Sequence, residues 1–260
     1  MVGHAEAQMA GGGRLRSTDE SARWAGRLAG VGAEIDMWRR FVALEGPDGA
    51  GKSRAAESLA RHLREAGRAV TLTREPGGTR LGEQVRAILL DPGPVPRSPE
   101  ADALLFSAAR AQLVREVIRP ALARGDVVVC DRFAASTLAY QGYGSRLDLE
   151  LLRGLEAFAV GGTRPDLVIL LDVPVELGLA RRGVGDPRQL TRFEDAARHD
   201  AAFHERVRGG YLALARQEPE RWRVVDGSGT PERVDAEVFR IVQGFLAESE
   251  PHAVAVRINR

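Results

Sequence analysis

The residues best suited to chemistry in this chain lie between Gly46 and Ser53, in the stretch GPDGAGKS. This stretch fits the pattern G-x-x-x-x-G-K-[ST] in full. It follows an apolar run and opens an amphipathic one, as a phosphate-binding loop does between a strand and a helix. Glycines let backbone N–H groups converge on phosphate oxygens, and the start of a helix adds a favourable dipole. The pattern therefore predicts binding of a nucleoside triphosphate by Gly46, Pro47, Asp48, Gly49, Ala50, Gly51, Lys52 and Ser53.

Lys52 is the only lysine of the chain, and the other 36 basic residues are arginines. Its ammonium group is a compact point charge that can bridge the terminal phosphates, whereas a planar guanidinium would need a differently shaped loop. The hydroxyl of Ser53 is a suitable ligand for Mg²⁺. We interpret the retained lysine as a sign that this position requires a point charge.

A second pair of chemically able residues, Asp131 and Arg132, ends the apolar run DVVVCD. In an open parallel sheet, ligands bind at the carboxyl ends of the strands. Asp131 could hold the magnesium shell, and Arg132 could grip a phosphate with two parallel hydrogen bonds. A structural ion pair is the alternative. Asp172 ends another apolar run in the same way and competes for the magnesium role, but Asp131 is favoured because an arginine accompanies it.

Further arginines stand where they could reach phosphates. Arg74 follows a strand-like run and precedes Gly77 and Gly78, and Arg110 lies among alanines on an apolar helical stretch, from which it could reach into a cleft or extend to the surface. The stretch 179–195, LARRGVGDPRQLTRFED, places Arg181, Arg182, Arg188 and Arg192 among glycine and proline. It suits a mobile flap that brings arginines to the transferred phosphoryl group, with a solvated loop as the alternative.

The elements that must position these residues alternate along the chain. Five short apolar runs predict strands at 41–45, 69–73, 126–131, 166–172 and 221–226. Amphipathic stretches such as 52–67 and 100–125 predict helices between them. The strand runs lack polar alternation, as expected where helices cover both faces of a parallel sheet. We predict one α/β domain.

Composition limits the remaining classes of protein. A net charge of +1 offers no overall attraction for nucleic acid or membranes, and no apolar run approaches the roughly 20 residues that span a bilayer. One cysteine, Cys130, excludes an internal disulfide, and the N-terminus has no signal-peptide pattern, so we expect a cytoplasmic protein that binds neither nucleic acid nor a membrane. Residues 1–36 have no persuasive periodicity, so we expect a disordered or mis-annotated extension, with the domain at 37–249 and a tail at 250–260.

The motifs together resemble the thymidylate kinase family over roughly Arg40 to Leu246. The most specific parts are TREPGGT, DRF followed by STLAYQG, and a phosphate loop with an acidic residue two places after its first glycine. The resemblance implies a three-layer P-loop kinase fold with a five-stranded parallel sheet and a flap, or LID. It also implies a homodimer that transfers the γ-phosphoryl group of ATP to dTMP with Mg²⁺, in line and without a covalent enzyme intermediate.

The resemblance assigns roles on the acceptor side. Asp48 is expected to contact the sugar 3′-hydroxyl, and Arg74, Arg110 and Arg132 to hold the acceptor phosphate. Phe106 is expected to stack on thymine. The base and sugar pocket would be lined by Thr137, Tyr140 and Gln141.

The resemblance also indicates where the catalytic arginine lies. Position 49 is glycine rather than arginine, which is similar to the bacterial branch that supplies this arginine from the flap. Arg192 best matches it, although Thr191 stands where the family usually has aspartate, and Arg188 or Arg181 could assist. The stretch 224–234 resembles the late loop that packs on adenine.

Two alternative functions stay open at this stage. One is a kinase of the same fold that acts on UMP, CMP, AMP or a modified nucleotide. The other is a nucleotide-dependent switch without kinase activity, although a set of acceptor-phosphate arginines is more than such a protein needs.

Overall fold

The computed structural model describes residues 40–91, 96–183 and 201–249. Four of the sequence predictions concern residues outside these ranges. They are the extension at 1–36, the tail at 250–260, and the flap residues Arg188 and Arg192.

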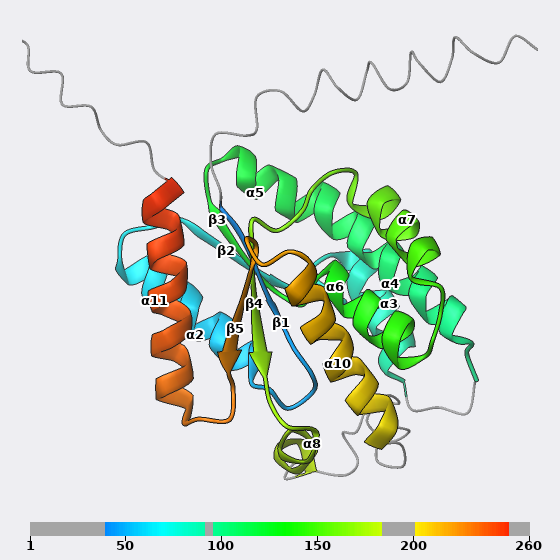
Figure 1. The fold of residues 1–260 in the computed structure, drawn as a ribbon. Coiled ribbons are helices and arrows are strands. Elements are labelled where there is room, and N and C mark those ends of the chain that lie inside the picture. The colour runs from blue at the N-terminus through cyan, green and yellow to red at the C-terminus, as the bar shows by residue number, and fades with distance from the viewer. Residues whose placement is uncertain (1–39, 92–95, 184–200, 250–260) are drawn as a thin grey trace, which may run out of the picture. The chain divides into compact units, whose positions relative to one another are not determined.

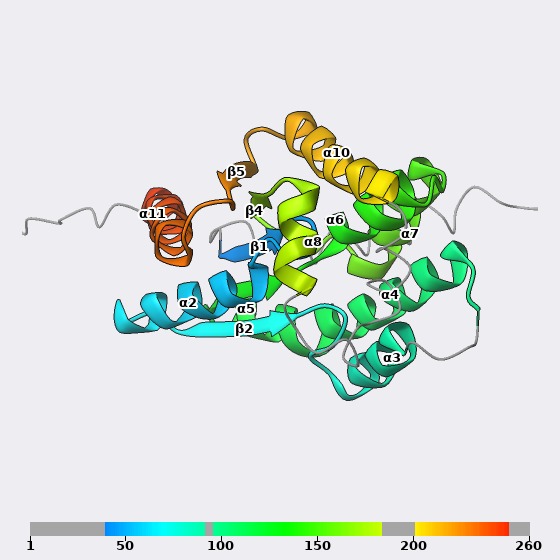
Figure 2. The same cartoon turned by 90° about the horizontal axis from the view of Figure 1, so that it is seen from below.

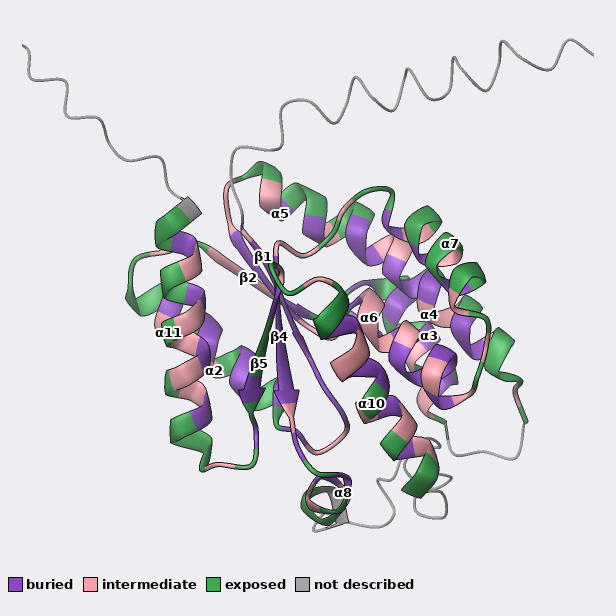
Figure 3. Cartoon of the chain, in the orientation of Figure 1, coloured by how far each residue is buried: buried purple, intermediate pink, exposed green. Residues whose placement is uncertain are grey.

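Five parallel strands form one sheet in the order β2-β3-β1-β4-β5 (Figure 1). The predicted strands are confirmed, and none of their boundaries differs by more than one residue from β1 Phe41–Glu45, β2 Val70–Arg74, β3 Val127–Asp131, β4 Leu167–Asp172 and β5 Trp222–Asp226. The central strands are buried along most of their length, and the edge strands β2 and β5 are partly exposed (Figure 3). Because all strands run in one direction, their carboxyl ends meet at one edge of the sheet.

Helices cover both faces of the sheet, as the sequence predicts. Their bounds are α2 Lys52–Glu65, α3 Arg80–Leu90, α4 Pro99–Leu113, η1 Val114–Ile118, α5 Arg119–Ala123, α6 Ala134–Thr137, η2 Leu138–Gly144, α7 Leu149–Val160, α8 Val175–Gly183, α10 Ala201–Gln217 and α11 Pro231–Ser249. Successive residues of a strand point to opposite faces. Val42 and Leu44 accordingly join the core under α2 and α11, whereas Phe41 and Ala43 pack under α4, η1 and α5. α10 covers the same second face over β4 (Figure 2), which gives three layers.

The predicted helix at 100–125 is helical as far as Ala123 but changes its winding in the middle. A π-helical segment, η1, joins α4 to α5, which has Pro120 in its first turn. Proline lacks the amide that would continue the α-helical ladder, and a wider turn before it accommodates this loss.

Helix α8 follows β4 and lies at the carboxyl edge of the sheet (Figure 1), close to the loop between β1 and α2. Across residues 40–91, 96–183 and 201–249, none of the helices combines the length and the apolarity needed to cross a bilayer.

Candidate active site

The loop between β1 and α2 has the conformation of a phosphate cradle. Its glycines adopt positive φ angles, with Gly51 at 88° immediately before the helix, and no side chain caps the first turn of α2. The N–H groups of this turn therefore point toward the loop, where phosphate oxygens can accept from them. Lys52 is 6% exposed, and its Nζ donates to the carbonyl oxygen of Pro47 at 2.8 Å.

Gly49 has a steric reason to be glycine. Its φ is +74°, and a Cβ there would lie 2.0 Å from the carbonyl oxygen of Gly178 on α8. The backbone of α8 thus occupies the space that a side chain at position 49 would need. A side chain at position 49, arginine included, is excluded for this reason.

Asp131 lies against the phosphate loop. Its Oδ2 accepts a hydrogen bond from Ser53 Oγ at 2.5 Å, and its buried Oδ1 has no hydrogen-bond partner among the described residues. A hydroxyl beside a carboxylate with an unsatisfied oxygen fits Mg²⁺, which binds few protein oxygens and completes its shell with water and phosphate. The competing Asp172 instead forms a two-pronged ion pair with Arg208, at 2.7 and 2.9 Å. The geometry supports Asp131 over Asp172.

Arg132 joins the phosphate loop to the predicted sugar pocket. Its Nη2 donates to Asp48 Oδ1 at 2.5 Å and to the Tyr140 hydroxyl at 3.2 Å, and its Nη1 donates to the carbonyl oxygen of Gly46 at 3.1 Å. The guanidinium carbon lies 5.1 Å from the centre of the Tyr140 ring, within the range of a cation–π contact. The structure therefore brings Asp48, Arg132 and Tyr140 together.

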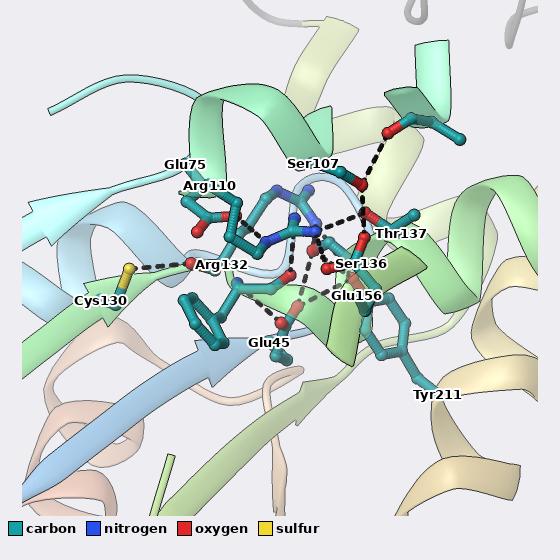
Figure 4. Close-up of polar contacts among 12 residues, drawn as sticks. Glu45, Glu75, Ser107, Arg110, Cys130, Arg132, Ser136, Thr137, Glu156 and Tyr211 are labelled. Carbon is teal, nitrogen blue, oxygen red and sulfur yellow. Dashed lines mark hydrogen bonds and ion pairs between the residues drawn. The ribbon is translucent and has the colours of Figure 1, made fainter. Parts of the chain in front are cut away.

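Arg110 lies in a different environment from the one expected. It is 1% exposed, and it forms ion pairs with Glu75, at 2.6 Å, and with Glu156 (Figure 4). It also donates to Thr137 Oγ1 at 3.0 Å. Its guanidinium already pairs with two buried acidic side chains, and one ionised carboxylate among them is enough to balance its charge, which argues against the expectation that Arg110 holds the acceptor phosphate. Burial, opposed by Arg110 and assisted by Glu156, raises the pKa of Glu75 to about 8.

The charge of Arg74 acts on Arg86, an arginine that the sequence analysis did not assign to the site. Arg74 is 54% exposed and donates to Glu83 at 3.2 Å. Arg86 is half-buried, donates to the carbonyl oxygen of Pro76, and has a pKa lowered by burial and then by the charge of Arg74. The positive charges of Arg74 and Arg86 repel each other, so an anion bound near both would be stabilised. The spacing in the sequence offered a signal for Arg86. It lies three residues after Glu83, the ion-pair partner of Arg74, and therefore on the same side of α3.

The residues predicted to form the base pocket come from α4, α6 and η2. Thr137 and Gln141 are buried beside one another in α6 and η2, at 1% and 3% exposure. Phe106 is half-buried one helical turn before Arg110, and it packs on the small cluster that α4 forms with α3.

The late loop resembling an adenine contact is held by Arg181. Its Nη1 donates to the carbonyl oxygen of Gly227 at 2.8 Å, and its Nη2 donates to that of Ser228 at 3.1 Å. Arg181 thus shapes this loop in the described structure, which leaves Arg188 and Arg192 as the flap candidates for catalysis.

Polar side chains that the sequence analysis missed lie next to the site residues, and all of them except Ser136 are buried. They are Glu45, Glu75, Ser136, Glu156 and Tyr211 (Figure 4). Glu45 carried a signal, since a charged residue ends an otherwise apolar strand directly before the phosphate loop. The others have no such local signal.

Comparisons with known proteins agree on one family. A family model described as Thymidylate kinase matches residues 44–238. The thymidylate kinase of Deinococcus radiodurans is 51% identical over 205 residues, which cover 78% of this chain and 95% of that protein. The thymidylate kinase of Thermomicrobium roseum is 52% identical over 202 residues, covering 78% and 93%. The crystal structure of thymidylate kinase from Ehrlichia chaffeensis matches with a TM-score of 0.62 and 32% identity, covering 78% of this chain and 98% of that one.

Proposed function

The chain belongs to the thymidylate kinase family, and we propose that it transfers the γ-phosphoryl group of ATP to dTMP, giving dTDP and ADP. The observation that carries this proposal is the contact between Asp48 and Arg132, at 2.5 Å. Asp48 belongs to the loop that cradles the donor phosphates, and Arg132 belongs to the wall of the acceptor pocket. The two nucleotides would therefore meet across this contact, as direct transfer requires.

On the donor side, the phosphate loop and the first turn of α2 would hold the phosphates of ATP through backbone N–H groups. Lys52 would place its ammonium group on the terminal phosphates. Ser53 and Asp131 are the residues that would hold Mg²⁺, which when bound supplies neutralisation of phosphate charge. The late loop, held by Arg181, would pack on adenine.

On the acceptor side, we assign the phosphate of dTMP to Arg74, Arg86 and Arg132. Asp48 and Tyr140 would line the sugar. Because the charge of Arg110 is balanced within the protein, we place it in the wall of the base pocket, where Phe106, Arg110, Thr137 and Gln141 would contact thymine.

The reaction on these residues needs no general base, because the acceptor phosphate is already a nucleophile. Its oxygen attacks the γ-phosphorus as the bond to the β-phosphate oxygen breaks, and the negative charge passes to ADP. Since α8 excludes a side chain at position 49, we assign the arginine that stabilises the transferred group to Arg192, with Arg188 as its assistant.

We also infer a homodimer, on the basis of large apolar side chains exposed on the neighbouring helices α4 and α7. Leu104 is 59% exposed, Leu151 74% and Phe158 86%. Exposure of this kind is typical of a surface that a partner covers. Light scattering should give the mass of two chains for the wild type and of one chain for Phe158→Asp; a wild-type monomer would refute the inference.

The location we propose is the cytoplasm, where ATP is present and the single, buried Cys130 stays reduced.

The function is tested by ADP formation from ATP and Mg²⁺ with dTMP, dUMP, UMP, CMP or AMP as the acceptor. Thymidine, which lacks the phosphate, is the matched control for dTMP. We expect a clear preference for dTMP and no turnover of thymidine. Losing only a methyl contact should lower kcat/KM for dUMP by about 10- to 100-fold.

Two other outcomes would contradict parts of this proposal. Preferred turnover of UMP, CMP or AMP would keep the kinase but refute the assignment of the base pocket. ATP hydrolysis that does not depend on any acceptor would instead favour a nucleotide-dependent switch.

A further inference from the structure

Arg132 is held in a backbone conformation that residues other than glycine seldom adopt. Its φ is 69°, in the left-handed region, where a side chain costs about 1 kcal/mol or more. Hydrogen bonds on both sides of the residue maintain it. The N–H of Arg132 donates to the carbonyl oxygen of Leu44, and the thiol of Cys130 donates to the carbonyl oxygen of Arg132, both at 2.9 Å.

The carboxylate of Glu45 forms hydrogen bonds with the backbone next to Arg132 and with hydroxyl groups next to its guanidinium. Glu45 ends β1 and is 0% exposed. Its Oε1 accepts from the N–H of Phe133, the residue after Arg132, at 2.8 Å. Its Oε2 accepts from the hydroxyls of Ser136, at 2.7 Å, and Tyr211, at 3.0 Å (Figure 4). Glu45 thus fixes the backbone beside Arg132 and two hydroxyl groups beside its side chain.

The hydroxyl of Tyr211 links the guanidinium to this carboxylate. Arg132 Nη1 donates to the Tyr211 oxygen at 3.1 Å, and the same oxygen donates its proton to Glu45 Oε2 at 3.0 Å. A hydroxyl that accepts from a cation and donates to a carboxylate uses both of its capacities, and such chains of hydrogen bonds strengthen one another in a buried site. Burial and then the charge of Glu45 raise the pKa of Tyr211 well above its usual value, so the hydroxyl keeps its proton.

Tyr211 reaches this position from a distant part of the chain. It lies on α10 and is separated from Arg132 by 79 residues. Its ring is fully buried and packs edge-to-face with the ring of Tyr140, with their centres 6.3 Å apart. Apolar packing therefore fixes the ring, and its hydroxyl group forms hydrogen bonds with Arg132 and Glu45. A phenylalanine would keep the packing and lose only the link.

We propose that Tyr211 is a positioning residue for Arg132, whose hydroxyl sets the place at which the guanidinium meets the acceptor phosphate. This proposal rests on the role assigned to Arg132 above. Without the hydroxyl, the acceptors that Nη1 retains among the described residues are Gly46 and Ser136, at 3.1 and 3.2 Å. The guanidinium is then free to turn toward Asp48, and Glu45 loses one of its three donors.

The test compares Tyr211→Phe with wild type in the binding of dTMP and thymidine, measured by calorimetry, and in turnover. The matched control is Tyr143→Phe, which removes a phenolic hydroxyl from the same aromatic cluster. We expect Tyr211→Phe to remain folded by thermal unfolding, to bind thymidine as wild type does, and to bind dTMP about 10- to 100-fold more weakly, as for a lost hydrogen bond to a charged group. Tyr143→Phe should match wild type in both.

A double-mutant cycle separates positioning from general support. In an Arg132→Ala background, the further change Tyr211→Phe should alter kcat/KM for dTMP by less than about twofold, because the group it positions is gone. Equal losses in both backgrounds, or equal weakening of dTMP and thymidine, would indicate a structural role and overturn the proposal. Wild-type affinity of Tyr211→Phe for dTMP would overturn it as well.

The same data separate this proposal from the assignment on which it depends. If Arg132→Ala bound dTMP like wild type, the assigned role of Arg132 would be wrong, and the positioning role would fall with it. If Arg132→Ala lost dTMP binding while Tyr211→Phe kept it, only the inference on Tyr211 would be overturned.

Discussion

Replacing Lys52 with arginine keeps the positive charge but changes its shape, and so tests whether this site needs a point charge. Lys52 is 6% exposed, and Nζ lies 2.8 Å from the carbonyl oxygen of Pro47, which defines where the cation must sit. A guanidinium is wider and planar, and it cannot place its charge at the same point inside this loop. The fold should persist, because the position and its charge are kept.

The size of the effect follows from the donors of the ammonium group. It has three N–H donors, and Pro47 accepts from one, so at most two remain for the phosphates. Hydrogen bonds to charged groups contribute about 1.5–3 kcal/mol each. Losing two in the transition state would cost about 3–6 kcal/mol, which corresponds to a decrease in kcat of about 10²- to 10⁴-fold.

The assay is ADP formation with saturating ATP, Mg²⁺ and dTMP, together with thermal unfolding. The control is Arg61→Lys on the same helix α2, an exposed residue paired with Glu65, which we expect to change neither stability nor turnover measurably. Turnover of Lys52→Arg within about threefold of wild type would refute the reasoning, since the loop would then tolerate either cation.

Three other changes test separate parts of the site. Gly49→Ala should destabilise the fold by more than about 1–2 kcal/mol, because φ is +74° and the new Cβ would lie 2.0 Å from Gly178, and it should abolish turnover; wild-type denaturation and activity would contradict this. Asp131→Asn should raise the Mg²⁺ concentration for half-maximal turnover about tenfold or more, whereas Asp172→Asn should leave it nearly unchanged; the reverse order would reassign the metal ligand. Burial raises the pKa of Glu75 from 4.5 to about 8, so its contribution to stability is full at low pH and is lost as the pH rises between these values. The Glu75→Gln variant stays neutral, so its free energy of unfolding in denaturant should rise relative to that of wild type between about pH 4.5 and 8 and level off above; a difference that is constant with pH would refute the shift.

The features that the sequence predicted well have local causes. The five strands and the helix after the phosphate loop follow from runs of apolar residues and from the spacing of glycines around Lys52. The pairing of Ser53 with Asp131 could be predicted, because the loop that follows one parallel strand and the last residue of its neighbour lie at the same edge of the sheet.

Arg110 is a residue whose surroundings in the folded protein a local sequence pattern does not predict. The family resemblance implied that Arg110 would hold the acceptor phosphate, but Glu75 and Glu156, 35 and 46 residues away, pair with it in the core. Whether a charged side chain is available to a ligand depends on which opposite charges surround it after folding. Neither glutamate carries a local pattern that indicates its partner.

The sequence by itself determined that this chain has a phosphate loop, a parallel sheet and a set of arginines, because short-range spacing encodes each of these. Only the tertiary structure decided that Arg110 is buried against two acidic side chains while Arg74 stays exposed, and it added Arg86, Glu45 and Tyr211 to the residues around the proposed site. The contact between Glu45 and Tyr211 spans 166 residues. Such a hydrogen bond exists only because β1 and α10 pack together, and packing at that separation depends on the whole fold rather than on any short stretch of the chain.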